Sequence, residues 1–547
     1  MTQTNDNIPS FNVWTEPWIT LEDPRGELSQ HGIHDALVHA HEYTAIYDPS
    51  PLVVVGIHRL LTAILQDALN PQENSDLERL WVDGKYPANK IEEFGSQYAD
   101  RFDLFSRDKP FLQSADLPMF PDEKERKISK RVAQLFPEAP SGSLVTHYRH
   151  ITDEEQVISP TAAALGLVAM PPFVSSGGAG LMPSINGVPP IYVLPSGKTL
   201  FEVLTASLIA SGLLNKYPKD NDLAWWKRPA PVVVHESKKK KPGMKFSEHC
   251  QLSEVGYLHG LTFPARKVRL HPERLNAVCS RTGNQSEWCV HTMAFRMGES
   301  CLEEVQWWDP FAAYRLPIKP TGKRKVSLSK KATDKPKPIR PMRTRVAWRE
   351  FSGLFLQRKD DSQQTQRPLF LNQLAALEVS KQIQTYPFRC IAWQTDGKMK
   401  FYEWMDFGFD IPSSLLQEPD GAEWTEQALS FATESANVIK SVFSSTFKRD
   451  VKSPERFRRM KERLDADYWS VLAGEFRQFV LDLGDLARQK ETLNGWLDTV
   501  IRQAQSAFER AADATGDDGN TLLKVEQGKE NCRKQLNILR SKTKQGG

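Results

Sequence analysis

The most informative stretch of the chain is residues 100–113, which read Asp100-Arg101-Phe102-Asp103-Leu104-Phe105-Ser106-Arg107-Asp108-Lys109-Pro110-Phe111-Leu112-Gln113. Three further segments accompany it in a fixed order along the chain. They are Trp14-Thr15-Glu16-Pro17-Trp18-Ile19, which predicts an opening strand; Ser141-Gly142-Ser143 through Ser159-Pro160-Thr161-Ala162-Ala163, leading to Gly177-Gly178-Ala179-Gly180; and Trp307-Trp308-Asp309-Pro310. Composition is uninformative by comparison, so these four segments are the best guide to what the chain is.

The length and composition are those of a multidomain globular protein. At 547 residues the chain exceeds what one hydrophobic core usually organises, so two or three domains are expected. Hydrophobic residues make up 40% and charged residues 25%, which is ordinary for a globular protein. The net charge of +3 does not indicate nucleic-acid binding by itself, so the distribution of charge has to be examined.

Cysteine usage and hydropathy predict a cytoplasmic protein that does not enter a membrane. Six cysteines at irregular spacing do not form a secreted disulfide framework. The N-terminal residues have neither the basic region nor the apolar core of a signal peptide. The longest apolar run, 51–69, is interrupted by His58 and Arg59, so it predicts a buried helix and not a membrane span.

One further helix and one extended region are predicted in the middle of the chain. Ser159 is a good N-cap and Pro160 suits the first helical position, so a helix should run to Ala169 and end at Pro171 and Pro172. Between residues 266 and 346 short β-type runs alternate with turn residues, which predicts an extended, irregular region.

From about residue 414 the apolar spacing becomes helical and predicts an antiparallel bundle of four or five helices. Ser453 and Pro454 should begin a separate helix there. The predicted buried stripes consist of Trp424, Ala428, Phe431, Val438 and Val442; Leu472, Phe476, Phe479, Leu483 and Leu486; Leu493, Trp496 and Val500; and Val525, Cys532, Leu536 and Leu539.

The four segments quoted above resemble the large subunit of the type I-E CRISPR surveillance complex, the CasA family of Cascade, over roughly residues 11–410. The resemblance implies an α+β fold. A large mixed domain with irregular β-rich insertions, residues 1–410, would recognise the flanking motif and dock at the 5′ end of the guide. An all-α four-helix bundle, residues 411–547, would follow.

The same resemblance implies a non-catalytic subunit of an antiviral ribonucleoprotein. It would recognise the protospacer-adjacent motif (PAM) in double-stranded DNA through the minor groove and promote duplex opening and R-loop formation. Its partners would be the CRISPR RNA, the target DNA, the other Cascade subunits and a helicase-nuclease that it helps to recruit. Guide pairing would supply the sequence specificity. Two alternatives remain open: a structural RNA-protein scaffold, and a metal-dependent nucleic-acid hydrolase.

Positive charge is concentrated between residues 315 and 345. This strip holds twelve Lys or Arg residues against one acid, Asp334. Such a strip neutralises phosphates and releases counterions, although a solvated surface loop has the same composition. By resemblance, a lysine shortly after Asp309-Pro310 reaches the minor groove. Lys319 stands in that place and Lys323 is the second choice.

The glycine-rich segment is a second candidate DNA contact. By resemblance, Gly177, Gly178 and Gly180 belong to a loop that enters the same minor groove, which is only about 6 Å wide and favours backbone without side chains. A plain turn between a helix and a strand is the alternative interpretation.

A hairpin predicted by the Asp-Gly pair at residues 396 and 397 is the third candidate. By resemblance it is a wedge that begins strand separation, and an ordinary hairpin explains the sequence equally well. The candidate residues are Gln394, Thr395, Asp396, Gly397 and Lys398.

Residues 146–149 stand where the related proteins contact the guide RNA and a neighbouring subunit. In Thr146-His147-Tyr148-Arg149, the tyrosine would stack on a base and the arginine would pair with phosphate. A buried tyrosine between surface polar residues is the alternative.

A zinc site is not expected, and no cofactor is predicted. The related proteins often carry a Cys-x-x-Cys-Gly turn, but here Thr282 replaces the second cysteine after Cys279. The hydrolase alternative would need a metal held by Cys279 with Cys289, His291 and Cys301, whose spacing is not a standard one. No Walker loop, nucleophile elbow or metalloprotease motif is present, so we expect a protein that is not an enzyme.

Overall fold

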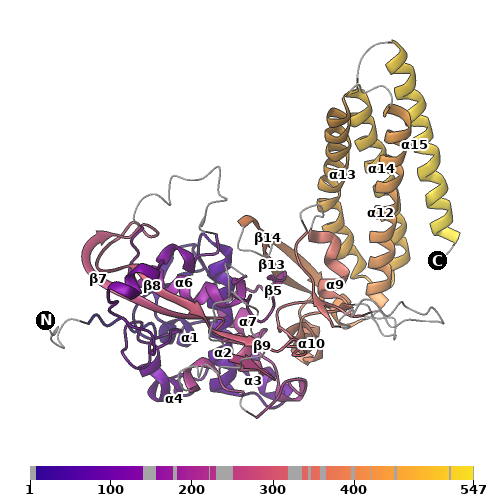
Figure 1. Cartoon of the computed structure of the whole chain (residues 1–547). Helices are drawn as coiled ribbons and strands as arrows, with labels where there is room; N and C mark the ends of the chain where they lie inside the picture. The colour runs from indigo at the N-terminus through magenta and orange to yellow at the C-terminus, as the bar shows by residue number, and fades with distance from the viewer. Residues whose placement is uncertain are drawn as a thin grey trace. The chain divides into compact units, whose positions relative to one another are not determined.

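The fold divides into two compact units. The computed structural model describes residues 8–138, 156–175, 181–220, 222–228, 250–317, 335–342, 347–357, 365–395, 401–418, 420–448, 453–515 and 519–545. Unit 1 consists of residues 1–341, 366–382 and 387–408, and unit 2 consists of residues 342–365, 383–386 and 409–547 (Figure 1). Each unit is described separately below.

Unit 1 mixes helices with small sheets. Its strands are β1 (Ile19–Glu22), β2 (Leu28–His31), β3 (Ala45–Ile46), β4 (Lys130–Arg131), β5 (Tyr192–Pro195), β6 (Cys250–Leu252), β7 (Arg266–Val278), β8 (Gln285–Met297), β9 (Glu299–Cys301), β10 (Tyr314–Arg315), β11 (Lys337–Pro338), and most of β13 (Thr385–Thr395) and β14 (Phe401–Pro412). Strand β12 (Thr365–Gln366) spans the boundary between the units.

The α-helices of unit 1 are α1 (Ile33–Val38), α2 (Pro51–Leu69), α3 (Asn74–Asp83), α4 (Ala88–Tyr98), α5 (Glu123–Ile128), α6 (Pro160–Phe173), α7 (Leu200–Thr205), α8 (Tyr257–Leu261) and α10 (Leu369–Ala376). Its short 3-10 turns are η1 (Ala99–Arg101), η2 (Val132–Leu135), η4 (Ser211–Leu213), η5 (Trp225–Lys227) and η7 (Glu378–Gln382). Unit 2 contains η6 (Ala347–Glu350), α9 (Phe351–Phe355), α11 (Ser413–Gln417), α12 (Asp420–Phe447), α13 (Pro454–Leu483), α14 (Gln489–Asp513) and α15 (Gly519–Gln545).

Helices α2 and α6 form the centre of unit 1. Every residue of α2 from Pro51 to Gln66 is buried, which confirms the predicted core helix. The two helices approach at Gly56, where an added Cβ would lie 2.4 Å from the carbonyl oxygen of Val168. Only glycine permits so close a backbone contact, so this residue sets the spacing between the helices.

Helix α6 begins as predicted and ends later than predicted. Ser159 caps it by accepting the Ala162 N–H, but the helix continues through Pro171 and Pro172 to Phe173. The carbonyl groups of this last turn have no partner inside the helix, and side chains from outside satisfy them. Ser184 Oγ donates to Pro171 O over 2.6 Å. The prediction that the prolines end the helix is therefore wrong.

The stretch 100–113 folds back onto the start of the chain. Its Phe102, Leu104, Phe105 and Phe111 side chains are buried. The Val13 N–H donates to Phe102 O over 2.9 Å, and the ring centroids of Trp14 and Phe102 lie 5.5 Å apart. Two of the four segments that characterise the sequence are thus packed together. The opening strand itself begins only at Ile19.

Two long strands dominate the region predicted to be irregular. Strands β7 and β8 have 13 residues each and pair in antiparallel register from Arg266 opposite Met297 to Val278 opposite Gln285. The shifts in register after Leu270 and Arg274 bend the hairpin. These breaks explain why the sequence pattern resembles a series of short strands.

Unit 2 is built on four long helices, α12 to α15 (Figure 1). The predicted stripe residues Phe431, Phe476 and Trp496 are buried, and Tyr468 OH donates to Ala432 O over 2.8 Å. Ser453 caps α13 by accepting the Arg456 N–H, so this helix begins at Pro454 as predicted. The α+β class with a C-terminal four-helix bundle is confirmed.

The predicted stripes differ in how deeply they are buried. Leu486 is 49% exposed because it lies beyond the end of α13. Trp424, Val438 and Leu539 are only half-buried. The remaining predicted stripe residues of the bundle are buried.

Candidate nucleic-acid interface

Most of the predicted contact residues lie outside the described residues. They are Gly177, Gly178, Gly180, Lys319, Lys323, Asp396, Gly397, Lys398, Thr146, His147, Tyr148 and Arg149. The two that are described lie at the end of β13, where Gln394 is buried and Thr395 is half-buried. The structure describes the residues that flank these segments, and their contacts are given below.

The described ends of the basic strip are paired with each other. Strands β10 and β11 pair in antiparallel register, with Tyr314 opposite Pro338 and Arg315 opposite Lys337. The Ile339 N–H extends this pairing by donating to Ala313 O over 2.8 Å. The first residue of the strip therefore lies beside residues 337–339, which belong to its later part.

Arg340, in the later part of the strip, contacts a turn near the glycine-rich segment. Its Nε donates to Val188 O over 2.9 Å and its Nη2 to Asn186 O over 3.2 Å. Gly187, between these residues, has φ of +68°, a conformation that favours glycine. Burial lowers the pKa of Arg340, whose guanidinium here binds backbone carbonyls.

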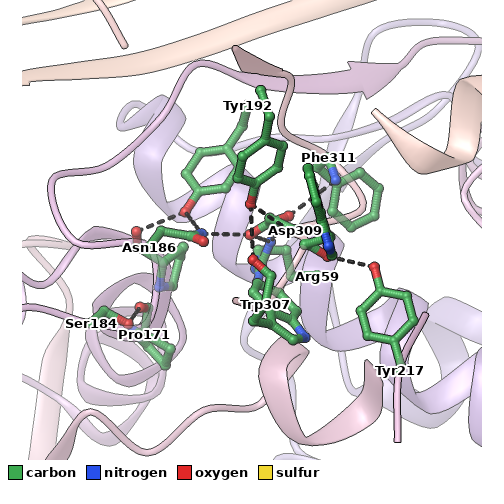
Figure 2. Close-up of polar contacts among 12 residues, drawn as sticks. Arg59, Pro171, Ser184, Asn186, Tyr192, Tyr217, Trp307, Asp309 and Phe311 are labelled. Atoms are coloured by element: carbon green, nitrogen blue, oxygen red, sulfur yellow. Dashed lines mark hydrogen bonds and ion pairs between the residues drawn. The ribbon is translucent and has the colours of Figure 1, made fainter. Parts of the chain in front are cut away.

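A buried ion pair lies beneath this turn. Arg59 of α2 and Asp309 are 4% and 0% exposed at their side chains, and Arg59 Nη1 lies 2.8 Å from both carboxylate oxygens (Figure 2). The guanidinium carbon also lies 5.4 Å from the ring centroid of Tyr192. Burial is the largest influence and opposes the charge on Arg59, but Asp309 together with Tyr192 and Tyr257 outweighs it and leaves the Arg59 pKa above its ordinary value.

Asn186 links the ion pair to the end of α6. Its Nδ2 donates to Asp309 Oδ2 over 2.7 Å, and Figure 2 shows Asn186 between Asp309 and Tyr192. Tyr192 OH donates to Pro172 O over 2.8 Å, so the network reaches the last turn of α6. That turn is followed after Ser175 by the glycine-rich segment.

Asp309 also organises the chain that leads to β10. The Phe311 N–H donates to Asp309 Oδ1 over 3.0 Å, and the Asp309 N–H donates to Tyr314 OH over 2.8 Å. Burial raises the pKa of Tyr314 well above its ordinary value, and the Asp309 charge raises it further, so the phenol stays protonated. One polar network thus supports the flanks of both the glycine-rich segment and the basic strip.

The turn from Cys279 to Gly283 organises the flanks of a third segment, 139–155. Ser280 N–H donates to Val157 O over 2.8 Å, and Val157 N–H donates to Ser280 Oγ over 3.1 Å. Arg281 Nη2 lies 2.8 Å from Asp48 Oδ1, and Arg281 Nη1 lies 3.4 Å from Glu138 Oε1. These contacts hold both flanks of the segment that contains the predicted RNA-docking residues.

The cysteines of the hydrolase alternative have separate local partners. Cys279 Sγ accepts the Ser159 N–H over 3.3 Å, whereas Cys289 Sγ donates to Ser286 O over 3.4 Å. Burial alone would raise the Cys279 pKa, but hydrogen bonds from Ser159 and Thr282 outweigh burial and lower it. Among the described residues, no group of three His, Cys, Asp or Glu side chains is arranged to hold a metal ion.

The sequence interpretation singled out the segment that contains Asp309 but missed the partners of that residue. Arg59 was recognised only as a break in an apolar run, although a charged residue in a buried helix implies a partner elsewhere. The Asn-Gly pair at 186 and 187 was an available turn signal. Nothing local identified Arg340, because its two carbonyl partners are more than 150 residues away.

A family comparison agrees with this architecture. The sequence pattern of the family described as CRISPR-associated protein Cse1 matches residues 12–507. The chain belongs to the Cse1 family. A curated relative, the CRISPR-associated protein CasA/Cse1 of Thermus thermophilus, is 27% identical over 97% of this chain and 98% of its own.

Solved structures share the fold of this Cse1-family chain. The crystal structure of CasA from Thermus thermophilus matches with a TM-score of 0.75 and 24% identity, covering 97% of this chain and 100% of that chain. A chain in a structure described as a CRISPR RNA-guided surveillance complex matches with a TM-score of 0.69 and 17% identity, covering 96% of this chain and 99% of that chain.

Proposed function

We propose that this chain is the large, non-catalytic subunit of a cytoplasmic CRISPR RNA-guided surveillance complex, and that it reads the PAM in double-stranded DNA. Within the complex it would dock at the guide RNA, promote duplex opening and R-loop formation, and help recruit a helicase-nuclease. Membership of the Cse1 family supports the subunit role. The proposal that this subunit reads DNA needs separate support from the structure.

The observation that carries the DNA-reading role is the shared support beneath two candidate contact segments. The Arg59–Asp309 pair, Asn186 and Arg340 connect the flanks of the glycine-rich segment and of the basic strip. Two segments that enter one narrow minor groove must do so at a fixed separation. A rigid common support provides such a separation, because buried charge-assisted hydrogen bonds have defined geometry.

Binding of assembled complexes tests the proposal. Guide-loaded complex with and without this chain is titrated with target duplexes that differ only in the flanking motif, at two salt concentrations. We expect motif discrimination only when the chain is present, and we expect Lys319→Ala or Gly178→Asp to abolish it.

Lys240→Ala is the matched control, because it removes a lysine from the 238–241 run, which the proposal leaves out of motif reading. It should leave the ratio of affinities for duplexes with different flanking motifs unchanged. Motif-blind binding that responds only to salt would identify the chain as a scaffold and refute the DNA-reading role.

A further inference from the structure

Arg266, the first residue of β7, is a buried cation that lacks a carboxylate partner among the described residues. It is 2% exposed. Its Nη1 donates to Met182 O over 2.6 Å and to Ala265 O over 2.8 Å, and its Nη2 donates to Ser175 O over 3.0 Å. Burial lowers its pKa to about 10. Its Nη1 also donates to Met297 Sδ over 3.7 Å, and its guanidinium carbon lies 5.9 Å from the ring centroid of Phe295. A buried guanidinium whose partners are all neutral is unfavourable for stability, so a role in positioning those partners would explain it.

The two distant carbonyls flank one segment of chain. Ser175 immediately precedes residues 176–180, and Met182 follows them after one residue. Met182 is fixed a second time, because its N–H donates to Met297 Sδ over 3.2 Å. The planar guanidinium has rigid donor directions, so it sets the separation of the two carbonyls that it bridges.

We propose that Arg266 is a positioning residue that fixes the spacing between the two ends of the glycine-rich segment and so determines how that segment meets the flanking DNA motif. The claim that Arg266 fixes the positions of Ser175 and Met182 concerns the protein alone. The claim about DNA rests on the proposed function. A lysine at this position would keep the charge but offer a single ammonium, so it cannot reproduce donation from two separate nitrogens.

Arg269 provides a matched control on the same strand. Burial lowers its pKa to about 10 as well, and its Nη2 donates to Arg107 O over 3.3 Å. Arg107 lies in the 100–113 stretch, away in sequence from the glycine-rich segment. Arg269→Lys therefore imposes the same chemical change on a buried arginine of β7 without touching Ser175 or Met182.

The experiment compares Arg266→Lys, Arg269→Lys and the unmodified chain by two measurements. Hydrogen-deuterium exchange of the full chain follows the amides of residues 175–182. Guide-loaded complex then gives the ratio of affinities for duplexes with and without the flanking motif. We expect Arg266→Lys to accelerate exchange at 175–182 and to lower the affinity ratio about tenfold, the loss expected for one hydrogen bond to a charged group. Arg269→Lys should change neither quantity.

Each result is decisive. Unchanged exchange and an unchanged ratio in Arg266→Lys overturn the inference, and so do equal effects of the two lysine variants, which indicate general destabilisation. If the unmodified complex does not discriminate between motifs, the proposed function fails, and exchange still decides whether Arg266 braces the segment. Should Arg266→Lys fail to fold, Met297→Leu removes the sulfur that accepts the Met182 N–H over 3.2 Å and an Arg266 Nη1–H over 3.7 Å, and it leaves the arginine in place. It should accelerate exchange at the same residues to a smaller extent.

Discussion

Breaking the Arg59–Asp309 pair should destabilise unit 1 far more than breaking an exposed pair. Asp309→Asn leaves the Arg59 cation buried without its counter-charge. Its new amide also meets two donors, since Asp309 Oδ2 accepts from Arg59 Nη1 at 2.8 Å and from Asn186 Nδ2 at 2.7 Å. Removing one partner of a buried pair costs about 3–5 kcal/mol. That is a large part of the roughly 5–15 kcal/mol that stabilises a typical domain.

A double-mutant cycle separates the interaction free energy between Arg59 and Asp309 from the cost of each substitution alone. Arg59→Met should also cost about 3–5 kcal/mol, because it leaves a buried carboxylate unpaired. The double variant contains neither charge, so it should be more stable than the sum of the single effects by about 3 kcal/mol. Urea unfolding is followed through hydrogen exchange of the α2 amides, which report on unit 1 and not on the bundle.

Arg389→Met is the control. Arg389 and Asp406 make a similar two-point contact, at 2.9 and 2.6 Å, but their side chains are 35% and 33% exposed. Its loss should cost about 0–1 kcal/mol. Additive single effects at Arg59 and Asp309, or single costs no larger than that of Arg389→Met, would refute the reasoning about burial.

Two further predictions concern acid and metal. His58 lies in the core, 2.9 Å from Ser207 Oγ, and burial followed by the nearby Arg59 charge lowers its pKa to about 3. Between pH 6.5 and 3 the unfolded chain therefore binds more protons, so stability falls with falling pH. His58→Gln should reduce the slope in urea unfolding by up to about 1.4 kcal/mol per pH unit, and an unchanged slope contradicts this assignment. Chelator should leave the melting temperature unchanged and metal analysis should find no stoichiometric zinc. The reason is that Thr282 replaces the second cysteine of the turn, and among the described residues no three His, Cys, Asp or Glu side chains are grouped to hold a metal ion. Zinc at one per chain would support the hydrolase alternative.

Local sequence signals predicted individual elements well. The apolar run 51–69 identified α2, and Ser159 with Pro160 identified the start of α6. Boundaries were wrong where distant groups intervene. Helix α6 continues past its predicted end, where Ser184 and Tyr192 satisfy its last carbonyls, and no local pattern contains that information.

The candidate site was predicted only as a set of segments. The resemblance pointed to the glycine-rich segment and the basic strip, but their common support depends on pairs such as Arg59 with Asp309, which are 250 residues apart. Arg266 and Met182 are 84 residues apart. Charge and spacing along the chain indicate which residues need partners, and the tertiary fold decides which partners they meet.

Because β10 pairs with β11, the residues between these two strands can be exchanged without moving the strands. Paired strands lie about 5 Å apart, so the chain departs and returns across a gap that does not depend on the length between them. Doubling the length of such a connection costs only about 0.6 kcal/mol in closure entropy. Connections of different length and charge can therefore be placed between Arg315 and Lys337 without rebuilding the core of unit 1.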